Sequence, residues 1–272
     1  MERAARGYWD RIALRWRIAE PLAPGREDID WFERRATQIA ANPARAMLLG
    51  VTAGIATMRW PAGTSLIAVD WSTNMLKIVW PAGGTPAGSA LICADWRELP
   101  VPAGALDLMI GDGCYTALGN IAEAAVLNAE MRRVLKPGGA VLMRCFCRPA
   151  SGLGVDALFD ALFAQRIRNL DLFRWLLAMA LQGASTTGVA VRSIWEQWAR
   201  RVPDARALQA RMGWTEDGIA NVERMAEATM TYSFASLEEL LRVAVPGFEV
   251  IEHDTPSYAW GEMFPRLVLR AR

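Results

Sequence analysis

The sequence is poor in lysine, histidine and cysteine, and it carries almost no net charge. Lys77 and Lys136 are the only lysines, so arginine supplies 28 of the 30 basic residues, and His253 is the only histidine. A formal net charge of +1 gives no broad electrostatic reason to bind nucleic acid or an anionic membrane. Four cysteines in 272 residues do not make a disulfide scaffold, and 53% hydrophobic residues exclude a disordered chain.

Long apolar runs are also missing. No stretch reaches the roughly 18 uninterrupted apolar residues of a membrane-spanning helix, and the most apolar helical stretch, 170–181, contains Asp171 and Arg174. The first ten residues lack the apolar segment of a signal peptide. We therefore expect a cytoplasmic protein with no membrane segment and no metal site, because the Cys-Phe-Cys spacing is not a zinc knuckle. The cysteines expected to be reduced are Cys93, Cys114, Cys145 and Cys147.

Short apolar runs alternate with helical patterns between residues 44 and 147. This alternation predicts βαβ units, and so a doubly wound α/β fold with a mostly parallel sheet. Right-handed crossovers would bring the carboxyl ends of the strands to one edge, where such folds bind ligands. The expected strands are 44–49, 65–69, 90–93, 105–110 and 140–147, and the expected helices are 55–60, 73–80 and 121–135.

The flanking segments have a different pattern. Tyr8, Ile12 and Trp16 share one face of an expected N-terminal helix, and a second helix is expected over 29–40. Ser236 and Glu239 form a capping-box pattern that begins a further short helix. The helices expected after residue 147, with no strand between them, are 155–183, 189–202, 204–212 and 216–228; the capped helix is 237–245, and two final strands are expected at 248–252 and 267–269.

Glycines and carboxylates follow the expected strands. The first strand opens into a tight turn from Gly50 to Gly54, which allows backbone to approach a ligand. It fails the dinucleotide fingerprint, because Thr52 and Ile55 stand where the second and third glycines belong. Asp70 ends the second strand and is placed to accept hydrogen bonds from a ribose.

Two more carboxylates end the next strands. Asp95 can accept a hydrogen bond from an adenine amino group. Asp112 lies between Gly111 and Gly113, in a turn that would present its carboxylate to the same edge of the sheet.

This set of motifs resembles the class I S-adenosylmethionine-dependent methyltransferases. The resemblance covers about residues 44–148 and extends over 231–272. It implies a Rossmann-like, mostly parallel seven-stranded sheet, S-adenosyl-L-methionine as cofactor, and methyl transfer by in-line displacement. The motifs that carry it, in the family's order and spacing, are the Gly50/Gly54 turn, Asp70, Asp95-Trp96 with Leu99-Pro100, and Arg133-Val134-Leu135-Lys136-Pro137-Gly138-Gly139.

The resemblance also implies site residues. Gly50 and Gly54 would lie against the methionine moiety, and Gly111 with Asp112 would lie near the sulfonium and the amino group. Met75 and Trp96 would flank the adenine. The full set expected to bind the cofactor is Tyr8, Trp16, Gly50, Val51, Gly54, Asp70, Trp71, Met75, Asp95, Trp96, Gly111 and Asp112.

Two departures from the family pattern matter. Leu48 stands where the family usually has an acidic residue, and Thr52 replaces the middle glycine. Our hypothesis is that Asp112, with Tyr8 or Trp16 from the N-terminal helix, supplies the missing contacts to the methionine end. The candidates for a catalytic acid or base are Asp112, Tyr115 and His253, with a solvated loop histidine as the plainer interpretation of His253.

Acceptor choice is expected to lie outside the cofactor core. We expect a lid over 1–43, core segments over 44–148 and 231–272, and a helical insertion over 149–230 that forms an acceptor cap or a homodimer interface. Near-neutral charge and aromatic-rich helices favour a small or medium organic acceptor over nucleic acid. The alternative is a cofactor-binding protein without methyl transfer, either a regulatory module or an aminopropyl-type transferase; a nicotinamide dehydrogenase fits the motifs poorly.

Overall fold

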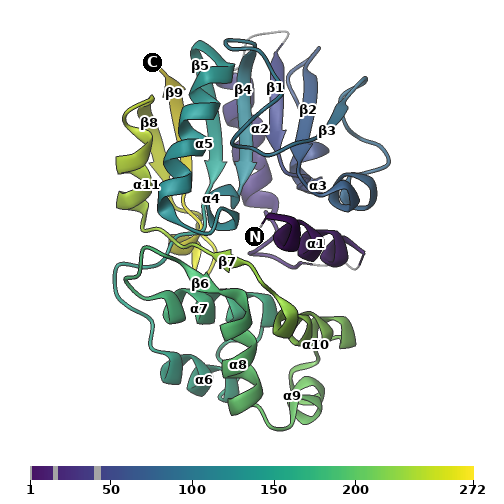
Figure 1. Ribbon diagram of the computed structural model, residues 1–272, viewed down its shortest axis with the longest axis vertical. Helices are drawn as coiled ribbons and strands as arrows, with labels where there is room; N and C mark the ends of the chain where they lie inside the picture. Colours follow the sequence, from purple (N-terminus) through teal and green to yellow (C-terminus); the bar gives the residue numbers. More distant parts are fainter. Residues whose placement is uncertain (1, 15–17, 40–43) are drawn as a thin grey trace.

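A seven-stranded sheet forms the centre of the fold (Figure 1). The computed structural model describes residues 2–14, 18–39 and 44–272. The strand order is β3-β2-β1-β4-β5-β9-β8. The first five strands in this order are parallel to one another, and β9 is antiparallel to both of its neighbours, β5 and β8. The predicted mostly parallel, doubly wound sheet is thereby confirmed. Its strands are β1 (Arg45–Leu49), β2 (Ser65–Asp70), β3 (Ala90–Cys93), β4 (Leu106–Asp112), β5 (Leu135–Arg144), β8 (Phe248–Asp254) and β9 (Arg266–Ala271).

Helices cover both faces of the sheet because its central strands are apolar on both sides. In β1, Leu48 packs in the core on the α2 and α3 side, whereas Leu49 packs on the α5 and α11 side. This alternation is the two-residue period of a strand buried on both faces. The covering helices are α2 (Arg26–Ile39) and α3 (Ala53–Ala56) on one face, and α5 (Ile121–Val134) and α11 (Leu237–Ala244) on the other; shorter turns are η1 (Met75–Val79), α4 (Cys114–Ala117) and η3 (Gly261–Met263).

The helical insertion lies beyond the carboxyl ends of the strands (Figure 1). It contains strand β6, in which Val189 pairs with Tyr232 just beyond the insertion, so our expectation of helices without strands was wrong. Strands of two residues are too short to leave an alternating pattern. The expected helix over 155–183 is also two helices, broken where Gln165 has a left-handed backbone and Asn169 caps α7. The elements are α6 (Val155–Phe163), α7 (Leu170–Gln182), β6 (Val189–Ala190), α8 (Val191–Arg201), α9 (Ala205–Met212), α10 (Glu216–Glu223), η2 (Arg224–Glu227) and β7 (Thr231–Tyr232).

Helix α1 (Glu2–Ala13) lies between the strand ends and the insertion (Figure 1). Ala13 packs with Val51 and Met75 on the sheet side, while Tyr8 is buried in the apolar core of the insertion. One helix therefore contacts both parts of the molecule. Trp16, which we expected on the same helix, lies outside the described residues.

Several boundaries differ from those predicted. The helix expected over 73–80 contains the π-helical segment η1, which stops at Trp80 with ψ 130°, since a residue before proline avoids helical backbone. Strand β5 begins at Leu135 rather than at residue 140, and Gly138 (φ 76°) makes the turn inside it. The capping box at Ser236 and Glu239 is confirmed. Among the described residues, no helix is long and apolar enough to cross a membrane.

Candidate active site

Three of the predicted cofactor residues meet at the ends of β1, β2 and β3. Gly50 has a left-handed backbone (φ 90°), which favours glycine. A side-chain carbon there would lie 3.5 Å from the Trp96 ring and 3.9 Å from Asp70 Oδ2. The Trp96 indole N–H donates to the Val69 carbonyl (2.7 Å), which fixes the ring over the turn. The glycine turn, the carboxylate and the indole thus converge on one spot.

Asp70 offers a buried hydrogen-bond acceptor at this spot. Its side chain is 7% exposed, and Oδ1 accepts from the Ser72 N–H (2.8 Å). Within the described part of the chain, no hydrogen bond reaches Oδ2. Burial raises the pKa of Asp70 to about 6; the Ser72 hydrogen bond opposes this shift and the nearby Asp10 carboxylate adds to it. A free carboxylate oxygen beside an open glycine turn fits the hydroxyl groups of a ribose.

Asp10 connects helix α1 by hydrogen bonds to the residues that follow Asp70. The Ser72 hydroxyl donates to Asp10 Oδ1 (2.5 Å), and the Asn74 N–H donates to the same oxygen (3.2 Å). The Asn74 amide then donates to the Asp10 carbonyl (3.0 Å). Helix α1 is therefore attached at the start of η1, directly over the end of β2. Sequence reasoning missed Asp10, because nothing in the local pattern marks it.

Asp95 lies in the predicted place but is already paired. Arg97 Nη2 lies 2.5 Å from Asp95 Oδ2, and the Arg97 N–H donates to Oδ1 (2.8 Å). Partial burial opposes the shift, but these contacts hold the pKa of Asp95 below its usual range. Arg97 in turn contacts Glu123 (2.7 Å). The adenine role of Asp95 stays a prediction.

Other predicted glycines are explained by packing. A side chain at Gly54 would meet Ile29 of α2 at 3.3 Å, so this position faces the helix. One at Gly111 would lie 2.6 Å from the Met143 sulfur, which leaves no room for it. Leu48, at the position of the family's acidic residue, is fully buried in the core on the α2 and α3 side.

The remaining predicted contacts lie around the same turn. Val51 and Met75 are buried together with Ala13 of α1. Trp71, the residue after β2, is half-buried. The structure thus places Val51 and Met75 near the Gly50 turn, but it gives Met75 and Trp96 different apolar neighbours.

Asp112 has a partner that the sequence did not predict. Its two carboxylate oxygens accept from Arg144 Nε (2.7 Å) and Nη2 (3.2 Å). Both side chains are buried, Arg144 completely. Burial raises the pKa of Asp112, and the Arg144 guanidinium opposes that shift. The carboxylate is therefore directed at Arg144, and the contact we hypothesised to the methionine end does not follow from this geometry.

The remaining donors of Arg144 reach the chain that precedes α2. Nη1 donates to the Pro21 carbonyl (2.7 Å) and Nη2 to the Leu22 carbonyl (2.5 Å). Nη1 also lies 3.3 Å from Asp28 Oδ2 at the start of α2. Every donor of a wholly buried guanidinium is thereby satisfied, as burial of a charge requires.

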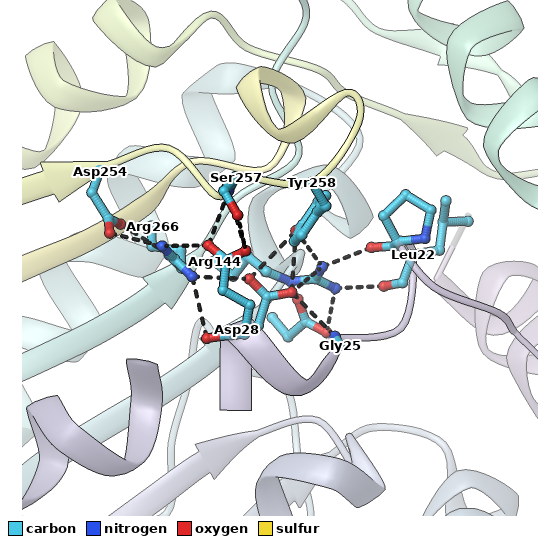
Figure 2. A network of polar contacts seen from close by, with 11 residues as sticks. Leu22, Gly25, Asp28, Arg144, Asp254, Ser257, Tyr258 and Arg266 are labelled. Atoms are coloured by element: carbon cyan, nitrogen blue, oxygen red, sulfur yellow. Dashed lines mark hydrogen bonds and ion pairs between the residues drawn. The ribbon is translucent and has the colours of Figure 1, made fainter. Parts of the chain in front are cut away.

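A second arginine extends this network to the last two strands (Figure 2). Arg266 pairs with Asp254 through two contacts, of 2.9 and 2.8 Å, and approaches Asp28 Oδ1 at 3.4 Å. The Tyr258 hydroxyl donates to Asp28 Oδ2 (3.1 Å). Asp28 therefore joins the two arginines. The network ties β4, β5, β8, β9 and α2 together at the ligand edge of the sheet.

Tyr115 and His253 are poorly placed for acid–base catalysis. The Tyr115 hydroxyl donates to Asn128 (2.7 Å) inside the core, and burial raises its pKa well above the usual range. We expected His253 to follow the strand, but it lies within β8, where it is exposed and pairs with Leu267 of β9. Four strand spacings, roughly 19 Å, separate β8 from the Gly50 turn.

Comparisons with known proteins identify the domain that contains these strand ends. Residues 48–143 match the family model described as a methyltransferase domain. A demethylmenaquinone methyltransferase of Mycolicibacterium gilvum is 28% identical over 215 residues, which cover 76% of this chain and 85% of that relative.

Solved structures agree on the fold. The N-methyltransferase NodS of Bradyrhizobium japonicum with bound S-adenosyl-L-homocysteine has a TM-score of 0.51 at 9% identity, over 98% of both chains. A Rhodobacter sphaeroides protein provisionally assigned as a zinc-dependent alcohol dehydrogenase has a TM-score of 0.65 at 16% identity, over 99% of both chains. At that identity the likeness concerns the fold alone. No group of His, Cys, Asp or Glu that could hold a metal occurs in the described part of this chain.

The chain contains a methyltransferase domain over residues 48–143, and its fold is shared with a solved N-methyltransferase that binds S-adenosyl-L-homocysteine. It is a methyltransferase enzyme, and its cofactor is S-adenosyl-L-methionine. The donor set at the strand ends fits that cofactor, because Asp70 keeps one carboxylate oxygen free beside the open Gly50 turn.

The buried network predicts a large effect of Arg144→Met. In the protein interior, Asp112 would lose its charge partner and Asp28 would keep only the more distant Arg266, so the free energy of unfolding should fall by about 3–5 kcal/mol in urea titrations at pH 7. The loss should shrink at acidic pH, where a protonated Asp112 costs less to bury. The control Arg242→Met removes an exposed pair with Glu238 and should cost under about 0.5 kcal/mol. A loss below about 1 kcal/mol for Arg144→Met would contradict the network's role.

Proposed function

We propose that the protein methylates a small or medium organic acceptor held between the strand ends and the helical insertion. The observation that carries the proposal is a chain of aromatic rings next to the end of β4. The Phe146 ring occupies the space beside Gly113, where an added side-chain carbon would lie 2.5 Å from it. Trp175 of the insertion packs on Phe146 with ring centres 5.8 Å apart, and Tyr232 packs on Trp175 at 4.9 Å.

The cofactor side of the proposal rests on the strand-end residues. When bound, S-adenosyl-L-methionine supplies an electrophilic methyl group on a positively charged sulfur. We assign the ribose to Asp70 and the Gly50 turn, and the adenine to the neighbourhood of Asp95, Trp96 and Met75. With the cofactor bound in this way, its methyl group would lie near Gly111 at the end of β4, on the side where the aromatic rings lie.

We propose that residues 1–43 act as a lid and residues 149–230 as an acceptor cap, around a core of 44–148 and 231–272. Helix α1 supports this division, because Asp10 is bonded on the sheet side and Tyr8 is buried on the insertion side. A helix held in this way would exclude water and orient the acceptor toward the strand ends. The name of the relative, demethylmenaquinone methyltransferase, also denotes an organic acceptor, and this supports the proposal.

Titration calorimetry with S-adenosylmethionine tests the cofactor assignment. Asp70→Ala should weaken binding about 10- to 100-fold, because hydrogen bonds to a charged group contribute about 1.5–3 kcal/mol. The control Asp156→Ala removes an exposed carboxylate on the insertion and should leave the affinity unchanged. Equal affinities of Asp70→Ala and the unaltered protein would remove Asp70 from the site.

The raised pKa of Asp70 predicts that cofactor affinity depends on pH. A protonated Asp70 has lost the charge that accepts hydroxyl hydrogen bonds, so affinity should rise as pH increases through about 6. Asp10→Asn removes the nearby negative charge and should move the midpoint of this dependence to lower pH. The measurement is calorimetry at intervals from pH 5 to pH 8. An affinity that does not change over this range would contradict the assignment.

Release of S-adenosyl-L-homocysteine from the protein with S-adenosylmethionine and a panel of aromatic acceptors tests the transfer itself. We expect product with at least one phenolic or aromatic-acid acceptor and none without an acceptor. Product formed only with nucleic acid or protein acceptors would contradict the proposed acceptor class.

A further inference from the structure

Arg174 of α7 is a buried cation with an unused donor. Its residue is 6% exposed, and its Nη2 atom is paired with Asp171 one helical turn earlier. Its Nε atom is buried and has no hydrogen-bond partner among the described residues. A buried N–H group without a partner is costly and rare in native proteins, so it marks a place where a ligand atom is expected.

The surroundings of Arg174 are aromatic. Trp175 packs on Tyr232, and the hydroxyl groups of Tyr232 and of Tyr8 from α1 are close enough to influence each other's pKa. Burial raises the pKa of both tyrosines, and the positive charge of Arg174 opposes the shift at each of them. Arg174 therefore lies where α1, α7 and β7 meet, on the insertion side of the lid.

The charge around Tyr8 is positive. Arg174, Arg11 of α1 and Arg224 of η2 are the charged groups that act most strongly on the Tyr8 hydroxyl. In the described part of the chain neither Arg11 nor Arg224 forms an ion pair with a carboxylate, and Arg224 donates only to the neutral Asn221. Among the described residues, Asp171 is the one carboxylate that forms an ion pair with any of these three arginines. A cationic, aromatic-lined region favours a planar anion.

We propose that Arg174 binds a negatively charged oxygen, carboxylate or ionised hydroxyl, on a planar organic acceptor. This inference rests on the proposed function, and it adds the charge of the acceptor, which the net charge of the chain did not reveal. The acceptor's ring would lie among Trp175, Tyr232 and Tyr8, and its far end would extend along Phe146 toward the end of β4. Displacement of α1 would admit it, since Tyr8 covers this region in the structure.

Three matched probes test the inference by equilibrium binding to the protein saturated with S-adenosyl-L-homocysteine. 4-Nitrophenolate and 4-nitrobenzoate carry the two kinds of anionic oxygen, and 4-nitrobenzyl alcohol is the neutral analogue. We expect at least one anion to bind tenfold or more tightly than the alcohol. The better anion identifies the oxygen as an ionised hydroxyl or a carboxylate. If 4-nitrophenol is the ligand, its absorbance should also show ionisation at lower pH when bound.

Two variants should act in opposite directions. Arg174→Met should weaken the bound anion about tenfold and leave the alcohol unchanged, whereas Asp171→Asn should strengthen the anion, because Arg174 loses its competing carboxylate. The control Arg192→Met removes an exposed arginine of α8 and should change neither affinity. Asp171→Asn keeps the test decisive if Arg174→Met does not fold.

The contradicting results are equally specific. Equal binding of the three probes, binding of neither anion, or no effect of either variant would overturn the role of Arg174. Calorimetry with S-adenosylmethionine separates this failure from a failure of the proposed function. Loss of anion binding with intact cofactor binding refutes only the inference, while absent cofactor binding by the unaltered protein refutes the function on which it rests.

Discussion

The wholly buried guanidinium of Arg144 holds together the parts of the molecule that form the site. It bonds Asp112 at the end of β4, Asp28 at the start of α2, and the carbonyls of the chain that leads there. That same chain reaches the insertion, because the Asn169 amide donates to the Glu20 carbonyl (2.7 Å). The sheet edge, residues 20–22 before α2, and the start of α7 are thus positioned from one point. Removing one partner would leave buried charge, so this arrangement tolerates little variation.

Helix α1 separates two regions of opposite charge. On the sheet side, burial raises the pKa of Asp70, and the negative charge of the nearby Asp10 adds to this shift. On the insertion side, Arg174 and Arg11 bring positive charge to Tyr8. A positively charged cofactor and a negatively charged acceptor would each meet the complementary side. The near-zero net charge of the chain conceals this division, since the two regions cancel in the sum.

The sequence predicts the fold well and the site in part. Alternation of apolar runs located the parallel strands, because the period of a strand is a local property, and the capping box located α11. The sequence also predicted that the Gly50 turn and Asp70 lie close together, because the carboxyl ends of parallel strands share one edge of the sheet. Pairing across the chain was not predictable. Asp112 meets Arg144, and Tyr115 meets Asn128, through contacts that only the folded core defines. Arg144 and Arg174 each stand inside an apolar run, and this pattern was the available signal that their charges are buried and need partners.

The central claim is that one site spans the strand ends and the insertion, with α1 between them. A crystal structure of the protein with S-adenosyl-L-homocysteine tests it most directly. The account predicts ribose hydroxyls within hydrogen-bond distance of Asp70 Oδ2, the adenine beside Trp96, and the sulfur directed past Gly113 toward Phe146. Electron density for the ligand elsewhere, or a ribose that makes no contact with Asp70, would contradict the account.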